Sequence, residues 1–125
     1  MIACDTSSLA AFLGGDFGAT DVQKIRAALT ASDLVLPPAT LTEALSNPRT
    51  LSAASALVSG LRVLEPTPDY WRRVAAARAR LIAKRLKARL ADALIAQSCI
   101  DANIELITRD RDFRHFAAHC GLKLA

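Results

Sequence analysis

The stretch IELITRDRDF, residues 104–113, decides the fold of this chain because it joins a short apolar run to an acidic loop and a helical pattern. Its first four residues are typical of a buried strand, and Phe113 begins the helical pattern. The chain starts in a similar way, since the run MIAC, residues 1–4, is followed by Asp5. In a parallel α/β sheet such junctions lie at the carboxyl ends of the strands, where ligands bind.

The same alternation of strand and helix extends along the whole chain. Short apolar runs predict strands at residues 2–5, 34–36, 61–64, 104–107 and 122–124. Helical patterns lie between them, near residues 9–13, 21–31, 40–46, 51–59, 69–83, 93–102 and 113–119. This alternation predicts an α/β fold, a three-layer α/β/α sandwich with a small, mostly parallel sheet. At 125 residues the chain is expected to form a single domain, residues 1–125.

Three helix starts are predicted from local chemistry. Residues 6–8, Thr-Ser-Ser, offer capping hydroxyls to the first helix. The pair Thr40 and Glu43 has the spacing of a capping box, so Glu43 has a structural explanation as well as a functional one. Pro68 suits the first helical position of the next long helix. On that helix we expect the apolar side chains to face inward, namely Trp71, Val74, Ala75, Leu81 and Ile82.

Positive charge is concentrated on one segment. The formal net charge is +4, and eight of the sixteen basic residues lie between Asp69 and Arg89. Such a run is either a solvated helix face or a surface that attracts phosphates. An acidic catalytic centre needs positive surroundings to hold a polyanion, which favours the second interpretation and a nucleic-acid substrate.

Four acidic residues occupy comparable junctions, namely Asp5, Glu43, Asp92 and Asp110. Carboxylates that converge in one crevice repel each other unless a hard cation lies among them. We therefore predict a site for Mg²⁺ or Mn²⁺, and such an ion is well suited to phosphodiester chemistry. No Ser-His-Asp set is recognisable, so the expected reaction is hydrolysis by metal-activated water.

The residues after the first strand disfavour other classes of protein. A receiver domain needs adjacent acids there and a late lysine, and a haloacid-dehalogenase-type phosphatase needs Asp-x-Asp, whereas Asp5 stands alone. The first residues lack a basic segment and no apolar run reaches the roughly 20 residues of a membrane span, so we expect a cytoplasmic protein.

The ordered motifs resemble those of the PIN-domain family. They are Asp5 to Leu9, Thr42-Glu43, Asp92-Ala93-Leu94-Ile95-Ala96 and Thr108 to Phe113. In length and motif order the chain is similar to VapC-type toxins, the ribonucleases of bacterial toxin–antitoxin pairs, and the resemblance covers essentially the whole chain. It departs from the usual pattern at residues 84–90, which lack a glycine often found there.

The resemblance implies a role for each matching residue. Asp5, Glu43, Asp92 and Asp110 match the family's acidic quartet, in which we expect Asp5 and Asp92 to be direct ligands of Mg²⁺ or Mn²⁺. Ser7 and Thr108 match nearby polar positions that orient water or ligands. Asp112 is either an outer ligand or the cap of the helix that begins at Phe113, and the cap is slightly favoured. The arginines expected to bind RNA are Arg85, Arg89, Arg109 and Arg111, although Arg109 and Arg111 also suit a plain surface role.

The resemblance implies partners as well. They are an RNA substrate cut to 5′-phosphate and 3′-hydroxyl products, a VapB-like antitoxin whose tail covers the acidic groove, and a second copy of the chain in a homodimer. Two alternatives remain open on the sequence alone. One is an RNA-maturation or decay nuclease of the same fold without an antitoxin, and the other is a PIN domain that binds RNA or protein without cutting.

Overall fold

The computed structural model describes residues 1–125, and its centre is one sheet of five parallel strands. The strands are β1 (Ile2–Cys4), β2 (Leu34–Leu36), β3 (Arg62–Val63), β4 (Glu105–Ile107) and β5 (Lys123–Leu124). Their order across the sheet is β3-β2-β1-β4-β5. The predicted α/β fold is confirmed, and the sheet is parallel throughout. Because β1 is central, its carboxyl end lies between those of β2 and β4.

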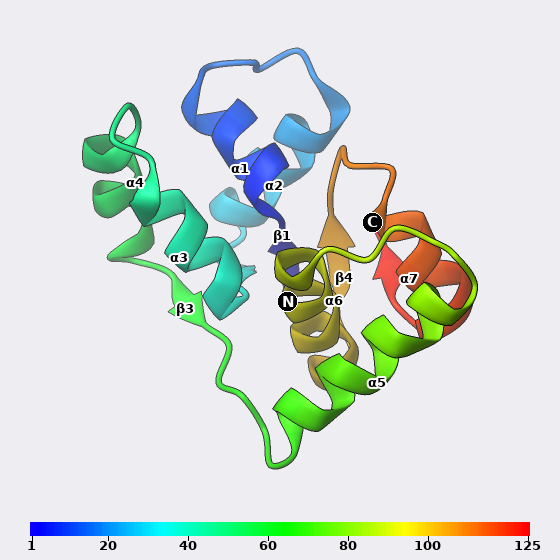
Figure 1. Cartoon of the computed structure of the whole chain (residues 1–125). Coiled ribbons are helices and arrows are strands. Elements are labelled where there is room, and N and C mark those ends of the chain that lie inside the picture. Colours follow the sequence, from blue (N-terminus) through cyan, green and yellow to red (C-terminus); the bar gives the residue numbers. More distant parts are fainter.

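Seven helices cover the sheet (Figure 1). They are α1 (Thr6–Leu13), α2 (Thr20–Thr30), α3 (Pro38–Ser46), α4 (Leu51–Val58), α5 (Tyr70–Ala83), α6 (Leu90–Ala102) and α7 (Phe113–Cys120). The first four pack in one group, in which α1 contacts α2 and α3, and α3 contacts α4. The other three pack in a second group, in which α5 contacts both α6 and α7. None of these helices combines the length and the apolar character that crossing a bilayer would require.

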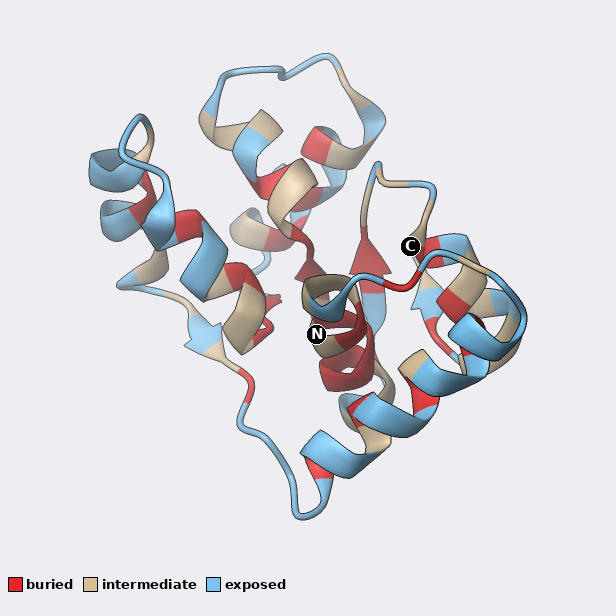
Figure 2. Cartoon of the chain, viewed as in Figure 1, coloured by how far each residue is buried: buried red, intermediate tan, exposed pale blue.

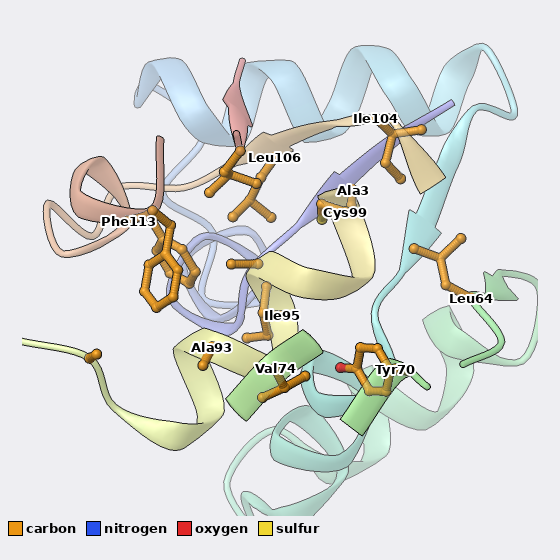
Figure 3. Close-up of a cluster of buried hydrophobic side chains, with 14 of the residues drawn as sticks. Ala3, Leu64, Tyr70, Val74, Ala93, Ile95, Cys99, Ile104, Leu106 and Phe113 are labelled. Carbon is orange, nitrogen blue, oxygen red and sulfur yellow. The ribbon is translucent and has the colours of Figure 1, made fainter. Parts of the chain in front are cut away.

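Alternating strand residues feed two hydrophobic clusters, one on each face of the sheet. Ala3 belongs to the cluster under α5, α6 and α7, whereas its neighbour Cys4 belongs to the cluster under α1 to α4. Figure 3 shows Ile95 and Cys99 of α6 among the sheet side chains of the first cluster. Buried residues follow the central strands β1 and β2, the end of β4 and the middle of α6 in Figure 2, whereas the edge strands and the outer sides of the helices are exposed. The three predicted layers are therefore present.

Three expected helix starts are wrong in detail. Asp5 itself caps α1, by accepting a hydrogen bond from the Ser8 backbone N–H at 3.0 Å, so residues 6–8 already belong to the helix. Helix α3 begins at Pro38, which places Thr40 and Glu43 inside the helix and excludes the capping box. Helix α5 begins only at Tyr70, after Asp69 has adopted a left-handed conformation with φ of 63°.

The inward face of α5 also differs from the prediction. Its buried residues are Tyr70, Val74, Ala77 and Leu81, which recur at helical spacing. Val74 and Leu81 are buried as predicted, but Trp71 and Ile82 are 67% and 51% exposed, and Ala75 is exposed as well. Alanines occur on both sides of this helix, so its sequence contains two overlapping apolar stripes, and only packing against α6 and α7 distinguishes them.

Thr40 ties the first turn of α3 to the end of β1. Its hydroxyl is fully buried and donates a hydrogen bond to the Cys4 carbonyl oxygen at 3.0 Å. A buried carbonyl that loses such a donor costs about 1–2 kcal/mol. This bond therefore helps to fix the backbone directly before Asp5.

We expect Thr40→Val, which keeps the shape of the side chain but removes the donor, to lower the free energy of unfolding by about 1–2 kcal/mol. Urea denaturation followed by circular dichroism measures this loss. The matched control is Thr40→Ser, which keeps the hydroxyl and should be less destabilised. A larger loss for serine than for valine would show that packing of the methyl group, and not the hydrogen bond, is what matters.

Candidate metal centre

Three carboxylates from two segments meet above the carboxyl end of the sheet. Asp92 is the third residue of α6, and Asp110 and Asp112 lie in the loop between β4 and α7. One carboxylate oxygen from each of the three lies within 4.8 Å of the other two. Asp92 and Asp110 were both predicted from the sequence to lie at one site, and the fold brings them together.

Asp92 is the least compensated member of this group. Its Oδ2 atom is buried and has no hydrogen-bond partner. Burial, and next the charge of Asp110, raise the pKa of Asp92 from 3.8 to about 6, and the nearby guanidinium of Arg89 opposes this shift. A buried carboxylate oxygen without a hydrogen-bond donor, on a residue close to two other carboxylates, is one that a cation would stabilise.

Asp5, at the end of β1, is held much more firmly. Its Oδ2 accepts hydrogen bonds from the hydroxyls of Ser7 at 2.8 Å and Thr108 at 2.6 Å, and its Oδ1 accepts the Ser8 N–H at 3.0 Å. Burial still raises the pKa of Asp5, although these three donors act in the opposite direction. Ser7 and Thr108 therefore orient a carboxylate, which is one of the roles expected for them.

The loop that carries Asp110 is folded by its own side chains. The Thr108 hydroxyl, which donates to Asp5, also accepts the backbone N–H of Asp110 at 3.0 Å. The Asp110 carboxylate accepts the N–H of Asp112 at 2.9 Å, the bond of an Asx turn. These bonds fix Asp110 relative to Asp5 through one threonine.

The slight preference for Asp112 as a helix cap is wrong. Asp112 occupies the cap position of α7, but its backbone is helical, with φ of −63° and ψ of −25°, and its side chain makes no capping bond. The carboxylate instead joins the group with Asp92 and Asp110 and forms an ion pair of 3.3 Å with Lys87. Asp112 therefore belongs to the acidic site by geometry.

Glu43 lies beside this group rather than in it. It is exposed on α3, and its Oε1 accepts the hydroxyl of Thr6 at 2.5 Å. Thr6 directly follows Asp5, and α3 packs against both α1 and α6. Glu43 is thus tethered next to the site, but it is not among the carboxylates that already lie within 4.8 Å of one another.

The four arginines expected to bind RNA fall into two kinds. Arg109 is exposed but is paired with acids of the chain itself, because its guanidinium forms hydrogen bonds with Asp21 at 2.7 and 3.0 Å and with Asp16 at 3.1 Å. Its contacts are those of an arginine that packs near the loop. Arg85, Arg89 and Arg111 are exposed, and Arg85 lies in the turn after α5 with φ of 59°.

The carboxylate group fits a small divalent cation. Opposite ligands of Mg²⁺, at bond lengths of about 2.1 Å, lie about 4.2 Å apart, so oxygens within 4.8 Å need little movement to surround one ion. All the candidate ligands are carboxylates, and hard cations such as Mg²⁺ and Mn²⁺ favour carboxylate ligands more than softer metals do. The unpaired oxygen of Asp92 supports the same conclusion.

Several supporting contacts have no recognisable signal in the sequence. Asp21 is an ordinary first-turn acid of α2, yet it accepts the Ser8 hydroxyl at 2.8 Å as well as Arg109. Lys87 is one of many basic residues, and only the fold places it on Asp112. The hydrogen bond from the Thr6 hydroxyl to Glu43 is likewise not recognisable in the sequence, because it joins residues 37 positions apart.

Comparison with known proteins gives one family and one fold. The family model described as the PIN domain matches residues 2–119. No curated protein sequence matches the chain.

Several solved structures are similar over their full length. A chain of VapBC2 from Rickettsia felis, bound to a DNA fragment from the promoter, has a TM-score of 0.73 at 18% identity, and the match covers 100% of this chain and 98% of that one. A chain of DNA-bound VapBC from Salmonella typhimurium has a TM-score of 0.73 at 19% identity, and the match covers 100% of this chain and 98% of that one. A chain of VapBC-1 from nontypeable Haemophilus influenzae has a TM-score of 0.74 at 18% identity, and the match covers 100% of this chain and 97% of that one. At these identities the likeness establishes the fold.

The raised pKa of Asp92 predicts that its ionisation destabilises the metal-free protein. The folded form holds a proton more tightly than the unfolded form, so this contribution is favourable at low pH and is lost as pH rises from about 4 to about 6. We expect Asp92→Asn in EDTA at pH 7.5 to be about 1–2 kcal/mol more stable than the parent, after allowance for solvent screening of a half-exposed carboxyl. Thermal unfolding at pH 7.5 and pH 4 measures this, and the difference should vanish at pH 4.

The control for this prediction is Glu105→Gln, which removes an exposed carboxylate from the opposite end of β4 and should leave stability unchanged. Added Mn²⁺ should stabilise the parent protein more than Asp92→Asn, because the ion binds only the folded state. An Asp92→Asn protein that is less stable than the parent in EDTA would show that the carboxylates do not repel each other in the fold.

Proposed function

The chain belongs to the PIN domain family, and we propose that it is a metal-dependent endoribonuclease that acts as the toxin of a type II toxin–antitoxin pair. The observation that carries this proposal is the group formed by Asp92, Asp110 and Asp112, with its buried, unpaired oxygen. The cofactor is proposed to be Mg²⁺ or Mn²⁺, because all the oxygens on offer are hard ligands.

Asp5 and Asp92 are proposed as the principal ligands, with Asp110 and Glu43 acting directly or through water. Asp92 brings an oxygen without a partner, whereas Asp5 brings one whose direction is fixed by Ser7 and Thr108. Asp112 extends the site on the side of Lys87. The chemistry that a divalent cation supplies is activation of water and neutralisation of phosphate charge.

The RNA substrate is proposed to approach past the exposed arginines. Arg85, Arg89 and Arg111 present guanidinium groups that suit phosphate oxygens, and Arg89 precedes the helix that carries Asp92. By family resemblance the products carry 5′-phosphate and 3′-hydroxyl ends. An RNA substrate also implies that the protein works in the cytoplasm.

The antitoxin part of the proposal draws on the structural neighbours. The three solved structures named above are VapBC structures, and the likeness extends over essentially the whole of each matched chain. We propose a VapB-like partner whose tail covers the acidic site, and a homodimer of the toxin itself. Exposed apolar side chains suitable for such contacts are Leu45 and Leu51 on α3 and α4, and Trp71, Ile82 and Leu90 on α5 and α6.

We expect the purified protein to cut RNA in Mg²⁺ or Mn²⁺, and to lose this activity in EDTA. Asp5→Asn and Asp92→Asn should each lower kcat by at least about 100-fold while the fold survives, because each removes a charge needed to hold the cation. Gel analysis of labelled RNA measures cleavage, and circular dichroism checks the fold.

The matched control is again Glu105→Gln, an exposed acid far from the cluster, which should cut RNA at the parent rate. Cleavage by Asp92→Asn at the rate of the parent protein would remove Asp92 from the catalytic site. Cleavage that persists in EDTA would contradict the metal-dependent mechanism as a whole.

The toxin role makes a separate prediction in cells. Induced expression of the parent chain should arrest bacterial growth, expression of Asp92→Asn should not, and co-expression of the protein encoded by the adjacent reading frame should restore growth. Colony counts after induction measure this. Growth that continues normally, with active ribonuclease confirmed in extracts, would favour an RNA-maturation or decay nuclease without an antitoxin.

A further inference from the structure

A network of hydrogen bonds centred on Asp21 of α2 connects to Asp5 at the end of β1. The Asp21 Oδ2 atom accepts the Ser8 hydroxyl at 2.8 Å and the Arg109 Nε–H at 2.7 Å, and its Oδ1 accepts Arg109 Nη2 at 3.0 Å. Arg109 Nη2 also reaches Oδ2 of Asp16 at 3.1 Å. One aspartate therefore joins the first turn of α1 to the loop that follows β4.

Two paths lead from Asp21 to Asp5, one through Ser8 and the other through Arg109 and Thr108. Ser8, held by its hydroxyl to Asp21, donates its backbone N–H to Asp5 Oδ1 at 3.0 Å. Thr108, the residue before Arg109, donates its hydroxyl to Asp5 Oδ2 at 2.6 Å. Each oxygen of Asp5 thus accepts a hydrogen bond from a residue that is directly linked to the ion pair, Ser8 through its bond to Asp21 and Thr108 as the residue before Arg109.

The path through Arg109 and Thr108 also includes Asp110. Its backbone N–H is bonded to the Thr108 hydroxyl at 3.0 Å, and it directly follows Arg109 in the chain. The guanidinium of Arg109 makes two parallel bonds to Asp21, a geometry that fixes orientation as well as distance. The ion pair therefore connects the loop that carries Asp110 to the same aspartate that accepts the Ser8 hydroxyl of α1.

We infer that Asp21 and Arg109 are positioning residues that set the metal affinity of the site, by holding the Asp110 loop against the first turn of α1. The inference rests on the metal site of the proposed function and assigns Arg109 to the support of that site, not to the binding of RNA phosphates. The side chain of Asp21 is 12% exposed and that of Arg109 is 40% exposed, so the pair lies at the surface with its aspartate partly covered.

The two possible roles of Arg109 predict opposite results for its partner. If Arg109 supports the metal site, then Asp21→Ala and Arg109→Ala break the same unit and share one phenotype. If Arg109 binds phosphate, then Asp21→Ala releases it and strengthens RNA binding, whereas Arg109→Ala weakens it. The comparison of the two variants therefore separates the roles.

The test is isothermal titration of the metal-free protein with Mn²⁺, together with kcat and KM for RNA cleavage at saturating Mn²⁺. We expect each alanine variant to bind Mn²⁺ about 10- to 100-fold more weakly, as is typical when a residue that orients metal ligands is removed. The double variant should be no weaker than the weaker single variant, because the pair acts as a unit. KM for RNA should remain within about twofold of the parent value, since a positioning role gives Arg109 no contact with the substrate.

Two conservative variants guard against a loss of folding. Arg109→Lys keeps the charge but not the paired geometry, and Asp21→Asn keeps the hydrogen-bonding shape but not the charge, so both should show intermediate Mn²⁺ affinity. The control is Asp101→Ala, which breaks the equivalent two-bond pair with Arg73 between α5 and α6. It should bind Mn²⁺ like the parent. An equal loss in Asp101→Ala would overturn the inference, because any broken ion pair would then have the same effect.

Other outcomes are equally decisive. Parent affinity in Asp21→Ala, or a raised KM with unchanged Mn²⁺ affinity in Arg109→Ala, would overturn the positioning role alone. A parent protein that binds no Mn²⁺ would remove the metal site and the inference with it. A parent protein that binds Mn²⁺ without cutting RNA would contradict the proposed function, while the binding series would still decide the role of Asp21 and Arg109.

Discussion

Mutual repulsion among carboxylates at the carboxyl end of a parallel sheet is the constraint on which the rest of this structure depends. The sheet order puts the ends of β1 and β4 side by side. Asp92, Asp110 and Asp112 lie there with carboxylate oxygens within 4.8 Å of one another, and the charge of Asp5 also acts on Asp92. Charges of the same sign at such distances interact by more than about 1 kcal/mol even near a surface, at an effective dielectric constant of about 20. A fold that retains them must compensate, either with its own donors or with a cation.

The two central aspartates are compensated in opposite ways. Asp5 receives three hydrogen bonds, two of them from residues of the helix that it caps, so its carboxylate is satisfied and aimed before any ligand arrives. Asp92 receives none at Oδ2, and burial raises its pKa to about 6. The carboxylate of Asp5 is therefore held in place by its donors, whereas the carboxylate of Asp92 lacks a group that would stabilise its negative charge. In the proposed metal site, Asp92 would therefore supply the carboxylate that gains most from a cation, and Asp5 would supply one that is already oriented.

The sequence predicted the elements that depend on local patterns and missed those that depend on distant partners. Residues 104–113 predict a strand, an acidic loop and a helix, because the apolar period and the junction residues all act within ten positions. The capping box at Thr40 and Glu43 failed because Pro38 starts the helix earlier and because each side chain has a partner more than thirty residues away. Trp71 was placed inside because α5 has two apolar stripes, and only its neighbours select one. The expected cap at Asp112 failed because the residue has helical dihedral angles, which no local pattern reveals.

The positive charge of the chain is divided between holding the fold and meeting a polyanion. Arg73 binds Asp101, Arg78 and Arg80 donate to the carbonyls of Ala88 and His119, and Arg109 binds Asp21, so these four are paired with groups of the chain itself. Near the carboxylates the compensating side chains are Lys87 on Asp112 and Arg89 beside Asp92. The acids at this centre outnumber those two cations, so the local field repels phosphate although the chain as a whole is positive. In the proposed nuclease a divalent ion would offset this excess of negative charge, which the two neighbouring cations do not, and would thereby help RNA phosphates to approach the site.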